Sequence, residues 1–114
     1  MRAASPRAIR ANAQRGTGSN IAYAAAKGAL NTLTMSLARA LAPEVRVVAV
    51  SPGFTDTGIN RARDPQVTAR LVAGLPLERK ARPEEMAAMI LAVVGPVAFC
   101  NGVVLVVDGG ASRV

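Results

Sequence analysis

Few residues of this 114-residue chain are able to carry out chemistry. The sequence has no histidine, which excludes histidine acid–base catalysis, every serine–histidine or cysteine–histidine arrangement, and most zinc sites. A single cysteine, Cys100, excludes an internal disulfide and a multi-thiolate metal site, so we expect no metal centre. The remaining candidates are Tyr23, Lys27 and a few carboxylates.

Tyr23 and Lys27 are four residues apart in a segment with helical periodicity. Residues at this spacing lie on the same face of a helix, one turn apart. A lysine ammonium near a phenol favours the phenolate form, and a tyrosine tuned in this way can donate or accept a proton near neutral pH. Because a solvated helix face also carries such pairs by chance, the surrounding sequence must decide between the two interpretations.

The element that must hold this pair is a long helix predicted over residues 21–41. Ser19 and Asn20 are good N-cap residues, and Pro43 ends the pattern. Apolar residues recur at intervals of three or four and form one stripe, which consists of Ala26, Leu30, Leu33, Leu37 and Leu41.

Two short apolar runs beyond this helix read as buried strands of an α/β fold. Each is continuous rather than alternating, which is typical of parallel strands covered on both faces. Two strands are too few for a free-standing parallel sheet, so the chain is expected to be part of something larger. The predicted elements are a strand over 45–50, a loop at 51–53, an irregular excursion with a short helix near 65–73, a helix from Pro83 to about Gly95, and a strand over 103–107 closed by the turn Asp108-Gly109-Gly110.

The segment Tyr23-Ala24-Ala25-Ala26-Lys27 strongly resembles the Tyr-x-x-x-Lys motif of the short-chain dehydrogenases/reductases. Residues 45–53 resemble the next strand and Pro-Gly turn of that family, while 82–87 and 102–110 resemble its C-terminal helix and last strand. A lone Tyr-x-x-x-Lys is common by chance, but four motifs in the right order and spacing are specific. The resemblance covers residues 16–114.

The resemblance implies an NAD(P)-dependent oxidoreductase, which reduces a carbonyl or oxidises an alcohol by hydride transfer with NAD or NADP. Tyr23 would be the proton donor to the carbonyl, or the base toward the alcohol. Lys27 would hold the nicotinamide ribose hydroxyls. The loop that cradles the nicotinamide carboxamide would comprise Pro52, Gly53, Phe54, Thr55 and Thr57.

The resemblance further implies a small-molecule carbonyl or alcohol substrate and a homo-oligomeric parent enzyme. Residues 58–80 correspond to the substrate loop, and six bases against two acids over 61–82 favour an acidic or carrier-bound substrate, or are simply solvated.

Despite a net charge of +7 we expect no nucleic-acid partner, because the bases do not share one helix face and aromatics are only 3%. No apolar run approaches a membrane span. The absence of a secretory signal and the single cysteine favour the cytoplasm.

Two departures from the family pattern concern the N-terminal half. No glycine-rich phosphate-binding turn is present, and the positions about 12–14 residues before Tyr23, where the family has a serine, hold Ile9, Arg10 and Ala11. Residues 1–15 carry four arginines and no acid, and are interpreted as an irregular basic leader to a partial domain over 16–114. We therefore expect the C-terminal part of a Rossmann-type doubly wound parallel sheet, with the nucleotide-binding half missing and little activity from this chain alone.

Three interpretations of such a partial domain stay open. The chain is a piece of a longer gene product, it pairs with a separate N-terminal chain, or it is a non-catalytic interaction module. In the last case it would dimerise, or associate with intact subunits, through the apolar stripe of residues 26–41 and the helix of residues 84–94.

Overall fold

The computed structural model describes residues 21–58 and 63–113. The leader predicted at 1–15 lies outside these described residues. The elements within them, in chain order, are α2 (Ile21–Ala40), β1 (Ala49–Pro52), α4 (Pro65–Ala73), α5 (Pro83–Val94), β2 (Val104–Val107) and a short 3-10 helix, η2 (Ala111–Arg113).

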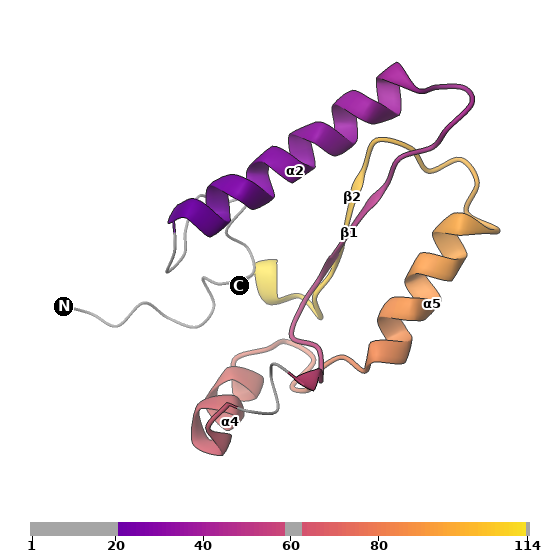
Figure 1. The fold of residues 1–114 in the computed structure, drawn as a ribbon. Helices are drawn as coiled ribbons and strands as arrows, with labels where there is room; N and C mark the ends of the chain where they lie inside the picture. The colour runs from indigo at the N-terminus through magenta and orange to yellow at the C-terminus, as the bar shows by residue number, and fades with distance from the viewer. Residues whose placement is uncertain (1–20, 59–62, 114) are drawn as a thin grey trace.

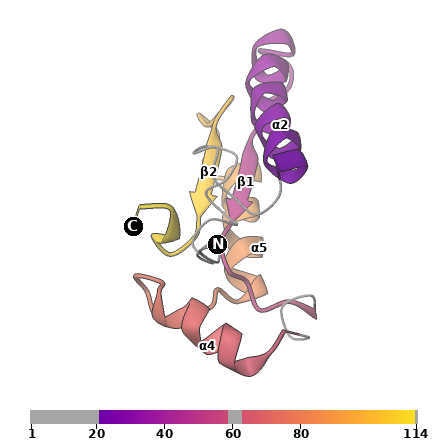
Figure 2. The same ribbon diagram turned by 90° about the vertical axis from the view of Figure 1, so that its left-hand side faces the viewer.

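Strands β1 and β2 pair in parallel, with Ala49 opposite Val104 and Pro52 opposite Val107. In Figure 1 the two strands run between helices α2 and α5. Figure 2 shows α4 beyond the end of the sheet, away from α2. The predicted α/β class with a parallel pair is therefore confirmed as a short α/β piece with a two-stranded sheet.

The start of β1 differs from the sequence prediction. The β-branched run led us to expect a strand over 45–50, but residues 45–48 have no regular structure and β1 begins at Ala49. The reason is visible at Val47, whose N–H donates to the side-chain oxygen of Asn101 at 2.8 Å, while its carbonyl accepts from Gly102 N. The backbone N–H and carbonyl of Val47 are thus bonded to the Asn101 side chain and to the Gly102 backbone, rather than to a neighbouring strand as in a sheet.

The end of β1 was also placed too early, because Ser51 and Pro52 belong to the strand rather than to the loop. Ala49 N donates to Val103 O at 3.0 Å, and Gly53 N donates to Val107 O at 2.8 Å. Because hydrogen-bonding groups alternate along a strand, residue 52 directs its nitrogen away from β2. Proline lacks an N–H, so it can end this strand without losing a bond to β2.

The two strands are half-buried rather than buried as predicted. Within the described residues the sheet consists of these two strands only, so there is too little neighbouring structure to cover them. The buried apolar side chains among the described residues are correspondingly few: Ala38, Phe54, Val93 and Ala111.

Helix α2 packs through a face of small residues, not through its leucine stripe. Its buried residues are Thr34 and Ala38, and the Ala38 carbonyl accepts a hydrogen bond from Asn101 Nδ2 at 3.1 Å. Small side chains allow the helix to approach the chain closely at Gly102. The stripe lies outside this contact, and its leucines are 37–49% exposed: Leu30, Leu33, Leu37 and Leu41.

The C-terminus of α5 is capped by Arg46, which comes from the segment before β1. Its guanidinium donates to Val93 O at 3.0 Å and Val97 O at 3.1 Å, and also reaches the carbonyls of Val94 and Cys100. The last carbonyls of a helix lack intrahelical partners and carry partial negative charge, so a cation there is favourable. Arg46 therefore fixes α5 against the beginning of β1.

Candidate active site

Tyr23 and Lys27 lie on one face of the first turns of α2, as predicted. Lys27 Nζ is 5.5 Å from the centre of the Tyr23 ring. This distance allows a cation–π contact and places the ammonium beside the phenol. Both residues are exposed, with Tyr23 accessible over 48% of its surface. The pair is accordingly open to a ligand from outside the helix.

The loop after β1 divides into exposed and buried side chains. Pro52 and Thr57 are exposed, whereas Phe54 and Thr55 are buried. The Thr55 hydroxyl donates to Gly53 O at 3.2 Å, so it turns back onto its own loop. A ligand on this loop would therefore meet the Thr57 side chain and backbone groups, with Phe54 and Thr55 supporting them from behind.

The pair and the loop lie at the same end of the molecule. The connection after α2 turns the chain back, so that β1 runs opposite to α2, and the first turns of α2 share an end with the carboxyl end of β1 (Figure 1). The carboxyl ends of parallel strands are where open α/β sheets bind ligands. The sequence-predicted site residues thus come from two elements that open on the same end of the sheet.

The turn at residues 108–110, after β2, contacts the first residue of the loop after β1. Gly53 approaches Asp108 so closely that a Cβ at residue 53 would overlap the Asp108 backbone. The Asp108 carboxylate accepts hydrogen bonds from Gly110 N at 3.0 Å and Ser112 N at 2.8 Å. Asp108 therefore ends β2 and caps η2, in agreement with the turn predicted at Asp108-Gly109-Gly110.

A second support of the loop was not recognised in the sequence. Asp56 N donates to Ala81 O at 2.9 Å, and Ala81 N donates to Phe54 O at 2.8 Å. Lys80 Nζ lies 3.3 Å from Asp56 Oδ1, and it also lies 5.6 Å from the Phe54 ring centre. The segment before α5 is thus paired with the loop through its backbone.

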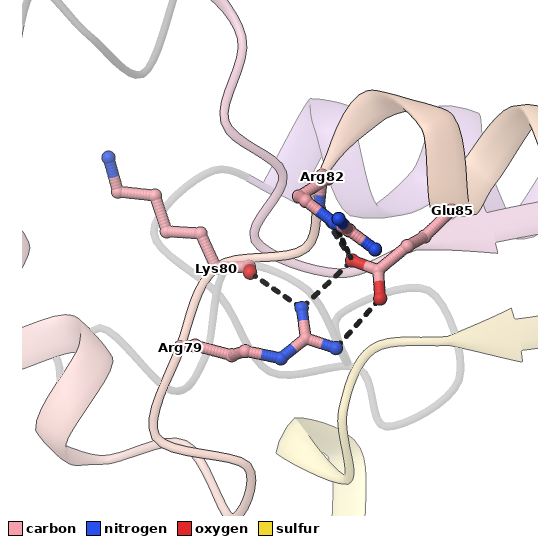
Figure 3. Close-up of polar contacts among 4 residues, drawn as sticks. All are labelled: Arg79, Lys80, Arg82 and Glu85. Atoms are coloured by element: carbon pink, nitrogen blue, oxygen red, sulfur yellow. Dashed lines mark hydrogen bonds and ion pairs between the residues drawn. The ribbon is translucent and has the colours of Figure 1, made fainter.

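Glu85 holds that segment in turn, as Figure 3 shows. Its two carboxylate oxygens accept from the Arg79 guanidinium at 2.7 and 2.8 Å, and one of them accepts from Arg82 N at 2.7 Å. The hydrogen bonds from Arg79 and from the Arg82 backbone, in that order, lower the pKa of Glu85 to about 2, and the pKa of Arg79 is raised by the same contact. The only sequence signal for Glu85 is an acidic residue in the first turn of the helix predicted from Pro83.

These contacts change the interpretation of the basic segment. Arg79 and Arg82 face Glu85, and Lys80 faces Asp56. Three of the six bases within 61–82 therefore meet acids of the same chain. The acidic or carrier-bound substrate stays a prediction.

The described residues offer donors that suit a nicotinamide cofactor. Tyr23 and Lys27 are exposed residues, and a hydroxyl and an ammonium are hydrogen-bonding groups of the kind that ribose hydroxyls require; Thr57 adds a hydroxyl on the loop. These residues therefore fit such a group.

Among the described residues no three His, Cys, Asp or Glu side chains gather as a metal site would need. No helix in that part of the chain is long and apolar enough to cross a bilayer.

Comparisons with known proteins decide the family. The family model described as enoyl-(acyl carrier protein) reductase matches residues 8–112. The short-chain dehydrogenase/reductase homolog YusR of Bacillus subtilis is 35% identical over 95 residues, which cover 83% of this chain and 72% of that protein. The chain belongs to the short-chain dehydrogenase/reductase family.

Longer members of the family match through the same region. Acetoacetyl-CoA reductase of Allochromatium vinosum is 36% identical over 87% of this chain and 41% of its own length. The Pseudomonas aeruginosa RhlG/NADP active-site complex is 34% identical, with a TM-score of 0.79, over 90% of this chain and 42% of that chain. The chain thus spans about two fifths of the first curated relatives that it matches. These relatives are oxidoreductases, and the family uses a nicotinamide cofactor and small-molecule substrates.

Proposed function

We propose that this chain carries the proton-transfer and carboxamide-binding part of an NAD(P)-dependent oxidoreductase that interconverts a carbonyl and an alcohol. The observation that carries this proposal is the Lys27 ammonium 5.5 Å from the Tyr23 ring on an exposed face of α2. The first turns of α2 share an end of the molecule with the carboxyl end of β1, where residues 53–57 continue as a loop.

Each residue has a role in this proposal. Tyr23 gives its hydroxyl proton to the substrate oxygen during reduction and takes it back during oxidation. Lys27 holds the ribose hydroxyls with its ammonium group. Backbone groups of residues 52–57 and the Thr57 hydroxyl orient the carboxamide. When bound, the cofactor supplies or accepts the hydride.

The proposal includes weak or no turnover by this chain alone. The first curated relatives, such as acetoacetyl-CoA reductase, are more than twice as long as this chain, and the described residues contain no glycine-rich phosphate turn following a strand. Positioning of both reactants accounts for a large part of the rate in such enzymes. We also assign the chain to the cytoplasm, on the basis of its single cysteine.

Nicotinamide fluorescence tests the proposal. NADH and NADPH are titrated into the purified chain, into Lys27→Ala and into Arg39→Ala, where Arg39 is an exposed base near the other end of α2. The proposal expects saturable binding that Lys27→Ala weakens about tenfold, which corresponds to the loss of one charged hydrogen bond, and that Arg39→Ala leaves unchanged. Equal affinity for all three proteins, or no binding at millimolar cofactor, contradicts a functional site in this chain.

A non-catalytic interaction module is a second candidate, favoured by the exposed leucine stripe of α2. Large apolar side chains of α5 are exposed as well: Ile90 at 49%, Leu91 at 68% and Val94 at 71%. Apolar patches of this kind mark association surfaces or aggregation sites. A self-associating species that Leu33→Glu converts to monomer supports the module, whereas a monodisperse monomer with a cooperative melt contradicts it.

A further inference from the structure

Glu85 joins three parts of the chain at one carboxylate. It lies in the first turn of α5, and its contact with the Arg82 N–H ties the start of that helix. Its bidentate contact with Arg79 reaches back six residues along the chain. A fork-to-fork pair of this kind fixes orientation as well as distance. Glu85 therefore holds both ends of the segment 79–82 on a rigid helix (Figure 3).

The residue between these two ends, Ala81, is the one that pairs with the loop after β1. Its carbonyl accepts from Asp56 N and its N–H donates to Phe54 O. Arg79 also donates to the Lys80 carbonyl at 3.1 Å, which orients the peptide immediately before Ala81. A continuous set of contacts thus leads from the Glu85 carboxylate to the backbone of residues 54–56.

The ion pair between Glu85 and Arg79 is expected to add little to the global stability of the chain. The Arg79 side chain is 53% exposed and that of Glu85 is 29% exposed, and ion pairs in such places contribute little to unfolding free energy. Helix α5 has other anchors, because Arg46 caps its far end and Val93 is buried. The main effect of Glu85 is therefore on the conformation of the loop at residues 54–57.

We propose that Glu85 is a positioning residue for the nicotinamide: through Arg79 and the segment 80–82 it fixes the loop 54–57 in the conformation that receives the carboxamide. This inference rests on the proposed function only for the identity of the ligand. The hold of Glu85 on the loop is a property of the chain itself and can be measured without any ligand.

Hydrogen exchange measures the hold directly. Glu85→Gln keeps an oxygen for the Arg82 N–H but loses the charged pair with Arg79, while Glu84→Gln removes a neighbouring exposed acid as the matched control. We expect exchange at the Asp56 and Ala81 amides to accelerate about two- to fivefold in Glu85→Gln only. The Ala49 and Gly53 amides, which bond to β2, serve as internal references. Unchanged exchange at Asp56 and Ala81, or equal acceleration at the references, overturns the proposal.

NADH affinity separates positioning from a merely structural role. Glu85→Gln is expected to bind NADH about two- to fivefold more weakly than the wild-type chain, with Glu84→Gln at wild-type affinity. Faster exchange with unchanged NADH affinity overturns the positioning role. If the wild-type chain binds no NADH, the proposed function of this chain fails, and the exchange result alone supports or overturns the hold on the loop. Arg79→Met, which leaves the cap at Arg82 intact, replaces Glu85→Gln if that variant does not fold.

Discussion

Gly53 and Asp108 meet backbone to backbone where the ends of β1 and β2 lie side by side. A Cβ on Gly53 would overlap the Asp108 backbone and come within 2.8 Å of its Cβ. Only glycine allows this approach without movement of one strand end. The loop predicted to receive the carboxamide therefore begins at a point fixed by the turn after β2.

Gly53→Ala is expected to destabilise the chain by about 1–3 kcal/mol, the usual cost of forcing a methyl group into a filled space. Chemical denaturation measures this loss. Gly58→Ala is the matched control, because no described residue lies within 4 Å of a Cβ there, and it should change stability little. Equal stability of Gly53→Ala and Gly58→Ala would show that the two strand ends are not in contact.

Arg46→Met is expected to cost about 1–2 kcal/mol, because the α5 carbonyls lose a charged donor. Methionine retains most of the apolar length of the arginine stem, so the change isolates the guanidinium. Arg39→Met removes a base in the last turn of α2 that has no such set of carbonyl contacts among the described residues, and should cost less than half as much. Thermal unfolding compares the two, and a larger loss for Arg39→Met would contradict the cap.

Stability is expected to fall as the pH drops from about 4.5 toward 2. The pKa of Glu85 is lowered from 4.5 to about 2 in the folded chain. Between these values the unfolded state binds more protons than the folded state. The stabilisation that Glu85 gives the folded chain is therefore present above pH 4.5 and is lost on acidification. Denaturation at a series of pH values should show a slightly shallower fall in Glu85→Gln than in Glu84→Gln, and the difference is small because solvent screens this exposed pair. Parallel pH profiles would contradict the ion pair.

Much of the fold could be predicted because local signals agreed with tertiary packing. The short helix 65–73 was predicted at its observed limits, since Asp64 caps Gln66 N and Pro65 suits the first turn. The start of α5 at Pro83 had the same kind of signal. Helix α2 and strand β2 also lie close to their predicted limits, within one or two residues.

The remaining differences come from long-range contacts that no local pattern contains. Residues 45–48 have strand composition, yet Val47 bonds to Asn101, 54 residues away. The leucine periodicity of α2 indicated an apolar face, but the helix packs through Thr34 and Ala38 instead. The Arg79–Glu85 pair was missed because its members are six positions apart, on either side of a helix start, and such a spacing has no fixed geometry.

The roles of the site residues stay predictions. The structure confirms that Tyr23 and Lys27 share a helix face. It also adds a distinction that composition could not make, since Phe54 and Thr55 are buried while Thr57 is exposed. Of the predicted loop residues, Thr57 is therefore the threonine side chain we expect to meet a ligand.

The central claim is that the first turns of α2 and the loop after β1 form one nicotinamide site. The most direct test is a titration of the isotopically labelled chain with NADH, followed by the backbone amide resonances of Tyr23, Lys27, Gly53 and Thr57. We predict that all four resonances shift together with a single dissociation constant, while that of Arg39, near the far end of α2, stays fixed. Shifts at only one of the two elements, or at neither, would contradict it.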